Sequence, residues 1–155
     1  MQTKNFKPLV FLFLLACSTA LFSFTAPKGG DVCEIYIDNT LLFRQFMTQT
    51  AGANTISLDQ NYSNSKLEVR YSHCGLSGKS RHIMVKDGQN NMIKEWQFPD
   101  AAPKNTGMSL NVKDVLSLQK SKTNTVLNLY YSSKELPDGK WLASIHLGDG
   151  NSTKP

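Results

Sequence analysis

Apolar and polar residues alternate along most of the chain, with the period of two that is typical of a β-strand buried on one face. In 31–38 three apolar residues alternate with more polar ones, the turn-forming residues Asp38-Asn39-Thr40 follow, and 41–47 is again apolar and aromatic. This combination predicts a β-hairpin near the start of the folded part.

The same alternation continues toward the end of the chain. It predicts further strands at 54–58, 66–72, 81–86, 92–98, 108–110, 125–132 and 140–147. Asp87-Gly88 predicts a second hairpin turn, Leu136–Gly139 another turn, and Asn111 the cap of one short helix. About eight short strands separated by turns predict an all-β fold, an antiparallel β-sandwich with one short helix, and a closed β-barrel is the alternative.

The N-terminal residues break this pattern. Lys4 and Lys7 precede an unbroken apolar run over 9–16, and small residues follow at 18–20. These are the three parts of a signal peptide, and they predict an exported protein that is periplasmic, at the cell surface or secreted. The chain then divides into a signal peptide or lipoprotein leader over 1–26, a linker over 27–30, a single β-sandwich domain over 31–148 and a flexible tail over 149–155.

The fate of the leader stays open. Leu14-Leu15-Ala16-Cys17 matches a lipobox, in which Cys17 becomes lipidated, but apolar residues follow where a polar tether is expected. Alternatively, Cys17 leaves with the leader. An uncleaved leader would act as an anchor, although Ser and Thr residues dilute its apolar stretch, and a spanning helix needs about 20 apolar residues.

Cys33 and Cys74 remain in the domain. In an oxidising compartment they are candidates for a disulfide, which would close a long loop and stabilise the fold by up to about 4 kcal/mol. The alternative is two separate thiols, at least one of them buried. The sequence does not decide between these, because it does not place the two Cα atoms.

The charges of the domain are dispersed. Without Lys4 and Lys7, 15 of the 17 basic residues remain against 12 acidic ones, a net charge of +3. No basic run exceeds two residues, whereas a nucleic-acid-binding protein normally shows a clustered basic stripe. We therefore expect no nucleic-acid partner.

Three segments of the chain resemble small exported proteins of Bacteroidota-type bacteria. They are Gly29–Tyr36 after a signal peptide, Tyr71–Gly75 and Tyr130–Gly139. The proteins of this group are uncharacterised. The resemblance implies a location in the bacterial envelope or outside the cell, and it implies no activity.

The segment 73–82 is the most unusual in the chain. Gly78-Lys79-Ser80 copies the end of a P-loop, but His73 stands where the first glycine is required, and a strand rather than a helix follows. The segment therefore fails as a nucleotide-binding motif. Lys79 and Arg81 remain candidates for a simple anion-binding or ligand-binding loop.

The same segment carries two further chemical interpretations beside that of a solvated turn. His73, Cys74 and His82 are ligand types suited to copper or zinc, but no metal-site spacing supports them, and adjacent residues of a strand point to opposite faces. A Cys74 nucleophile with a histidine base, or a serine from this segment, would make a small hydrolase-like enzyme. No G-x-S-x-G motif supports that alternative.

Tyrosines on the strands are candidates for an aromatic binding surface, in particular Tyr36 and Tyr131. Tyr130 and Tyr131 must face opposite sides of their strand, so one of them can be core and the other exposed. The alternative is that the large aromatic side chains fill the interior.

These patterns favour an exported, non-enzymatic β-sandwich module for binding or envelope structure. Its partner would be an extracytoplasmic protein or a glycan, and it would contact a membrane only through an uncleaved or lipidated N-terminus. We expect no catalytic residue and no cofactor. The alternative is a hydrolase-like enzyme or a metal-binding protein that uses His73, Cys74 and His82.

Overall fold

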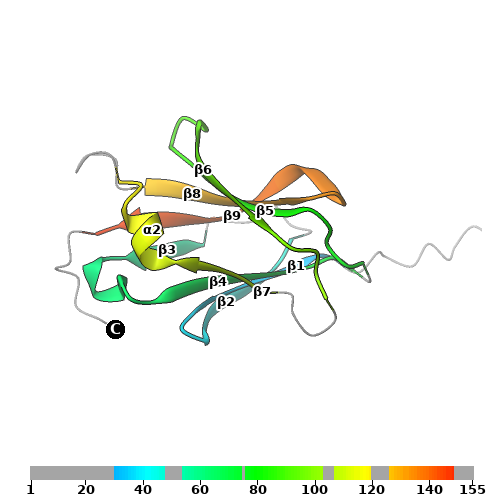
Figure 1. Cartoon of the computed structure of the whole chain (residues 1–155), viewed down its shortest axis with the longest axis horizontal. Helices are drawn as coiled ribbons and strands as arrows, with labels where there is room; N and C mark the ends of the chain where they lie inside the picture. The colour runs from blue at the N-terminus through cyan, green and yellow to red at the C-terminus, as the bar shows by residue number, and fades with distance from the viewer. Residues whose placement is uncertain (1–29, 48–53, 75, 103–106, 120–125, 149–155) are drawn as a thin grey trace, which may run out of the picture.

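The computed structural model of the chain describes residues 30–47, 54–74, 76–102, 107–119 and 126–148. Their strands form two sheets that pack face to face (Figure 1). The predictions for the leader over 1–26, for Cys17, for most of the linker and for the tail over 149–155 lie outside the described residues.

Nine strands lie in this part of the chain. Sheet A has the order β2-β1-β4-β7, with β1 at Val32–Ile37, β2 at Thr40–Phe46, β4 at Lys66–Ser72 and β7 at Gly107–Asn111. Sheet B has the order β3-β9-β8-β5-β6, with β3 at Thr55–Leu58, β5 at Arg81–Lys86, β6 at Met92–Phe98, β8 at Val126–Ser133 and β9 at Leu136–Leu147. Neighbouring strands are antiparallel except for β3 and β9, which are parallel.

The predicted all-β sandwich is confirmed, and the two sheets do not close into the alternative barrel. Burial follows the predicted alternation: every second residue is buried along β1, β4, β5 and β8. The core therefore lies between the sheets, where inward side chains such as Ile35, Val69, Val85 and Leu129 are fully buried.

The predicted hairpin between β1 and β2 is also confirmed. Asp38 and Asn39 both have positive φ, at 47° and 68°, as the turn that suits a two-residue hairpin requires. The predicted turn at Leu136–Gly139 is wrong. The chain reverses earlier, at Lys134–Glu135, and residues 136–139 already belong to β9.

The short helix α2, Val112–Leu116, covers one end of the sandwich (Figure 1). Asn111 stands at its N-cap position, as predicted, but its side chain donates to Asp114 Oδ2 instead of capping the helix. Three of the five helical residues are buried in the core. A single 3-10 turn, η2 at Gln60–Tyr62, is the other helical element of the described chain. In that same part of the chain no helix is long and apolar enough to cross a membrane.

Candidate functional site

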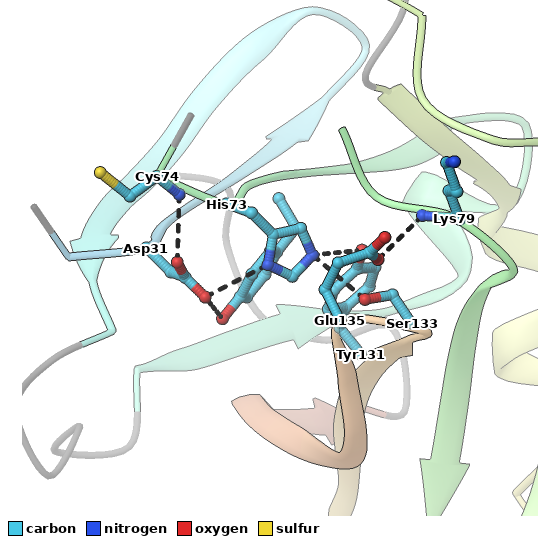
Figure 2. A network of polar contacts seen from close by, with 8 residues as sticks. Asp31, His73, Cys74, Lys79, Tyr131, Ser133 and Glu135 are labelled. Carbon is cyan, nitrogen blue, oxygen red and sulfur yellow. Dashed lines mark hydrogen bonds and ion pairs between the residues drawn. The ribbon is translucent and has the colours of Figure 1, made fainter. Parts of the chain in front are cut away.

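A buried polar cluster joins the two sheets at the end of the sandwich where β1 begins (Figure 2). Asp31 directly precedes β1, and Tyr71 and His73 come from the end of β4. Tyr131 and Ser133 come from the end of β8 in sheet B. Because residues two apart on a strand share a face, both members of each pair point into the space between the sheets. We call these five residues the inter-sheet cluster.

Asp31 is the acceptor at one side of the inter-sheet cluster. Its Oδ2 accepts a hydrogen bond of 2.9 Å from Tyr71 Oη and lies 3.4 Å from His73 Nδ1. Its Oδ1 accepts the backbone N–H of Cys74 at 3.3 Å. One carboxylate therefore holds the start of β1 against the end of β4.

The other ring nitrogen of His73 faces sheet B. Nε2 lies 3.0 Å from Tyr131 Oη and 3.1 Å from Ser133 Oγ. A carboxylate can only accept, so the hydrogen of the neutral ring belongs on Nδ1, toward Asp31. Nε2 then carries the single lone pair of the ring, and it can accept from either of the two hydroxyl groups.

Aromatic rings pack around these polar contacts. The rings of Tyr71 and Tyr131 stack across the two sheets, with centroids 4.2 Å apart and planes at 17°. Tyr131 is fully buried and His73 is 8 % exposed. Burial raises the pKa of both tyrosine hydroxyls, so they stay protonated and remain donors.

Glu135 lies at the other side of the inter-sheet cluster, in the turn between β8 and β9. Its Oε2 accepts the backbone N–H of Lys79 at 2.9 Å, and this hydrogen bond is the main reason why the pKa of its carboxyl is lowered. His73 thus lies between two carboxylates, Asp31 on one side and Glu135 on the other (Figure 2).

The candidate disulfide is not formed, because Cys33 and Cys74 are both free thiols. Cys33 occupies an inward position of β1 and is fully buried in the core. Cys74 is exposed, and its sulfur points away from the cluster (Figure 2). The alternative of two separate thiols, one of them buried as a small apolar residue, is the observed arrangement.

The two thiols should differ strongly in reactivity. Burial raises the pKa of Cys33 to about 12, whereas Cys74 is exposed. We expect iodoacetamide at pH 8 to alkylate Cys74 in the native protein and Cys33 only after unfolding. Peptide mapping by mass spectrometry checks this. Equal native labelling of both thiols, or a loss of 2 Da without reductant, would contradict the arrangement.

The predicted metal ligands do not converge. His73 points into the space between the sheets, whereas His82 occupies an outward position of β5 and lies beside Glu95, with 2.8 Å between Nδ1 and Oε1. Cys74 is exposed at the end of β4. Within the described ranges no three His, Cys, Asp or Glu side chains come together as a metal site.

The prediction that Lys79 and Arg81 form an anion-binding loop is wrong for Arg81. Arg81 is 2 % exposed, and its Nε donates to the carbonyl of Pro99, so its guanidinium is part of the core. Lys79 is exposed, and its backbone N–H is held by Glu135. These two residues therefore do not present a shared cationic surface.

Of the two tyrosines predicted to form an aromatic surface, one is buried and the other is partly exposed. Tyr131 is wrong as a surface residue, because it is fully buried. Tyr36 is half-buried at an outward position of β1, where the Arg70 guanidinium lies 4.3 Å from its ring centroid and its hydroxyl donates to Glu34. Glu34 also pairs with Arg44 of β2. The outer face of sheet A is therefore a polar ladder in which Tyr36 is one member.

A second candidate surface lies along β2, an edge strand of sheet A. It is formed by three large apolar side chains, Leu41, Leu42 and Phe46, which are 45 %, 44 % and 64 % exposed. They are three of the five large hydrophobic residues exposed in the described chain. The charge of Arg44, between them, is paired with Glu34. We call these three residues the β2 edge surface.

Asp31, Ser133 and the β2 edge surface are not among the residues predicted from the sequence. Ser133 stands two places after Tyr131, so strand alternation alone would have placed both on one face. The sequence shows the apolar run over 41–47, but which strand lies at the edge of a sheet depends on long-range pairing.

No protein-family model matches the sequence, and no curated protein is similar to it.

Proposed function

We propose that the domain is an exported binding module, and that it receives an extended segment of a partner protein along the β2 edge surface. Export is supported by the signal-like leader over 1–26. The observation that carries the binding role is the apolar edge strand. Natural edge strands are usually short or charged, because an unpaired edge is a template for another chain.

The other edges of the two sheets fit that protective pattern better. β3 and β7 are short, with four and five residues. β6 carries the exposed charged residues Lys94 and Glu95. β2 has seven residues and a single charge, which is paired within sheet A. A partner strand on β2 would gain backbone hydrogen bonds and cover apolar side chains, which is the mode called β-augmentation.

A peptide selection with the mature domain tests this proposal. We expect displayed random peptides that bind the domain to be apolar and β-forming, and to protect the amides of 40–46 from hydrogen exchange. The double variant Leu42→Lys, Phe46→Lys should weaken their binding by about 30-fold to 1,000-fold, since two desolvated contacts of about 1–2 kcal/mol each are lost.

Met92→Lys is the matched control, because Met92 is a 50 % exposed apolar residue on β6, an edge of the other sheet. It should leave the affinity unchanged. Selected peptides that bind the double variant as tightly as the unmodified domain, or that protect no amide of β2, would refute the role of this edge.

A further inference from the structure

Within the inter-sheet cluster an acid lies next to a histidine, and the histidine lies next to a serine. Asp31 Oδ2 lies 3.4 Å from His73 Nδ1, and His73 Nε2 lies 3.1 Å from Ser133 Oγ (Figure 2). The two ring nitrogens thus face a carboxylate on one side and a serine hydroxyl on the other. This is the arrangement in which a histidine acts as the general base for a serine nucleophile.

We propose that Ser133 is an activated nucleophile with His73 as its base, and that the pair hydrolyses small neutral esters. This activity goes beyond the binding role of the β2 edge surface and uses a different part of the molecule. Asp31 is the positioning residue, since it holds the Nδ1 hydrogen and leaves the Nε2 lone pair toward Ser133. Tyr71 Oη and the Cys74 N–H hold Asp31 in turn.

In the first step Ser133 Oγ attacks the carbonyl carbon of the ester and forms the Oγ–C bond. His73 Nε2 takes the serine proton and then gives it to the alkoxide as the C–O bond to the leaving alcohol breaks. Water, deprotonated by the same nitrogen, then attacks the acyl-serine, and the proton returns to Oγ as the carboxylic acid leaves. No oxidant, metal or cofactor enters this balance.

Tyr131 is placed to assist the step. Its hydroxyl lies 3.0 Å from the same Nε2. Burial keeps this hydroxyl protonated by raising its pKa. When Nε2 takes the serine proton, the Tyr131 O–H can donate to the oxygen that becomes negative on the substrate.

Burial and charge define the substrate class. Ser133 is 5 % exposed, so a bulky acyl group cannot reach Oγ. The Glu135 carboxylate, which accepts the Lys79 N–H, lies at the Ser133 side of the cluster (Figure 2) and would repel an anionic substrate. Short, uncharged acyl esters fit both conditions, whereas phosphate esters and free carboxylates do not.

A small alkyl fluorophosphonate tests the nucleophile directly. Ser133 Oγ should displace fluoride from phosphorus, and intact mass should show one phosphonyl group per chain, which peptide mapping places on Ser133. Ser133→Ala should remove the adduct. Ser132→Ala is the matched control, because Ser132 is the neighbouring serine at an outward position of β8. It should label like the unmodified protein.

The mapped adduct keeps the test valid even if Ser133→Ala does not fold. The proposal would be overturned if the native chain carried no adduct under conditions that fully label a known serine esterase. An adduct on another residue would overturn it as well. Turnover is checked with 4-nitrophenyl acetate, which the unmodified protein should hydrolyse at least about tenfold faster than Ser133→Ala. Equal rates would overturn the hydrolytic step.

The positioning role of Asp31 has its own readout. Asp31→Asn should slow phosphonylation about 100-fold or more, because it no longer fixes the hydrogen on Nδ1. Asp31→Glu, which keeps the carboxylate, should recover a large part of the rate. A purely structural carboxylate would instead give the same rate in both folded variants.

Discussion

Replacing Tyr131 by alanine should lower the free energy of unfolding by about 3–5 kcal/mol, the range for truncating a buried aromatic side chain. Tyr131 is fully buried, and its ring stacks on Tyr71 of the opposite sheet. The variant therefore removes core area and also one hydroxyl partner of His73. Urea denaturation followed by circular dichroism measures the change.

Two variants separate the causes of this loss. Tyr131→Phe keeps the ring and removes only the hydrogen bond to His73, so we expect a loss of about 1 kcal/mol. Tyr130→Ala removes the neighbouring tyrosine, which is half-buried on the outer face with Lys86 4.5 Å from its ring centroid. That variant should lose clearly less than Tyr131→Ala. Similar losses for the two alanine variants would mean that the two faces of β8 are assigned wrongly.

The strands of this protein were predictable because their signal is local. A period of two over five or six residues identifies a half-buried strand without knowledge of its partners, and β1, β4, β5 and β6 lie within one residue of the predicted ranges. Leu136–Gly139 shows the limit of the approach. Pro-Asp-Gly is turn chemistry, but it forms an irregularity inside β9: pairing with β8 is present at Leu136 and Lys140 on either side of it, and Gly139 takes a positive φ of 71°.

The features that could not be predicted depend on which strands pair with each other over long distances in the sequence. The parallel pairing of β3 with β9 joins segments about 90 residues apart, and neither segment carries a sequence signal for this pairing. Long-range pairing also explains why the sequence did not decide whether the two cysteines form a disulfide. Strand alternation places Cys33 inward, but only the pairing of β1 with β4 shows that the chain at Cys74 has already left the sheet and turned its thiol outward.

The inter-sheet cluster combines three segments that are far apart in sequence. Asp31, His73 and Ser133 are separated by 42 and 60 residues, and they meet only because β1 pairs with β4 while β8 packs opposite them. Short motifs around His73 therefore point to Cys74 and His82, and the fold turns both of these side chains away from the cluster. Buried polar groups that are all paired also fix one relative position of the two sheets.

Removing the Asp31 carboxylate should destabilise the domain by about 2–4 kcal/mol, because three groups lose their acceptor at once, and a buried donor without an acceptor costs about 1–3 kcal/mol while an exposed one costs less. Asp31→Ala leaves Tyr71 Oη, the Cys74 N–H and His73 Nδ1 without their common acceptor. Asp100→Ala is the matched control. Its carboxylate accepts one backbone N–H, from Ser80, at an exposed position, so we expect a loss of about 0.5–1.5 kcal/mol.

A double-mutant cycle shows how much of that loss belongs to a single contact. Tyr71→Phe removes the hydroxyl that donates to Asp31 Oδ2 at 2.9 Å and keeps the stacked ring. In the Asp31→Ala background the same change should cost about 1 kcal/mol less than in the unmodified protein, because its partner is already absent. Additive losses would show that this hydrogen bond contributes nothing to the joining of β1 to β4. The remaining loss of Asp31→Ala would then have to come from its contacts with His73 and Cys74.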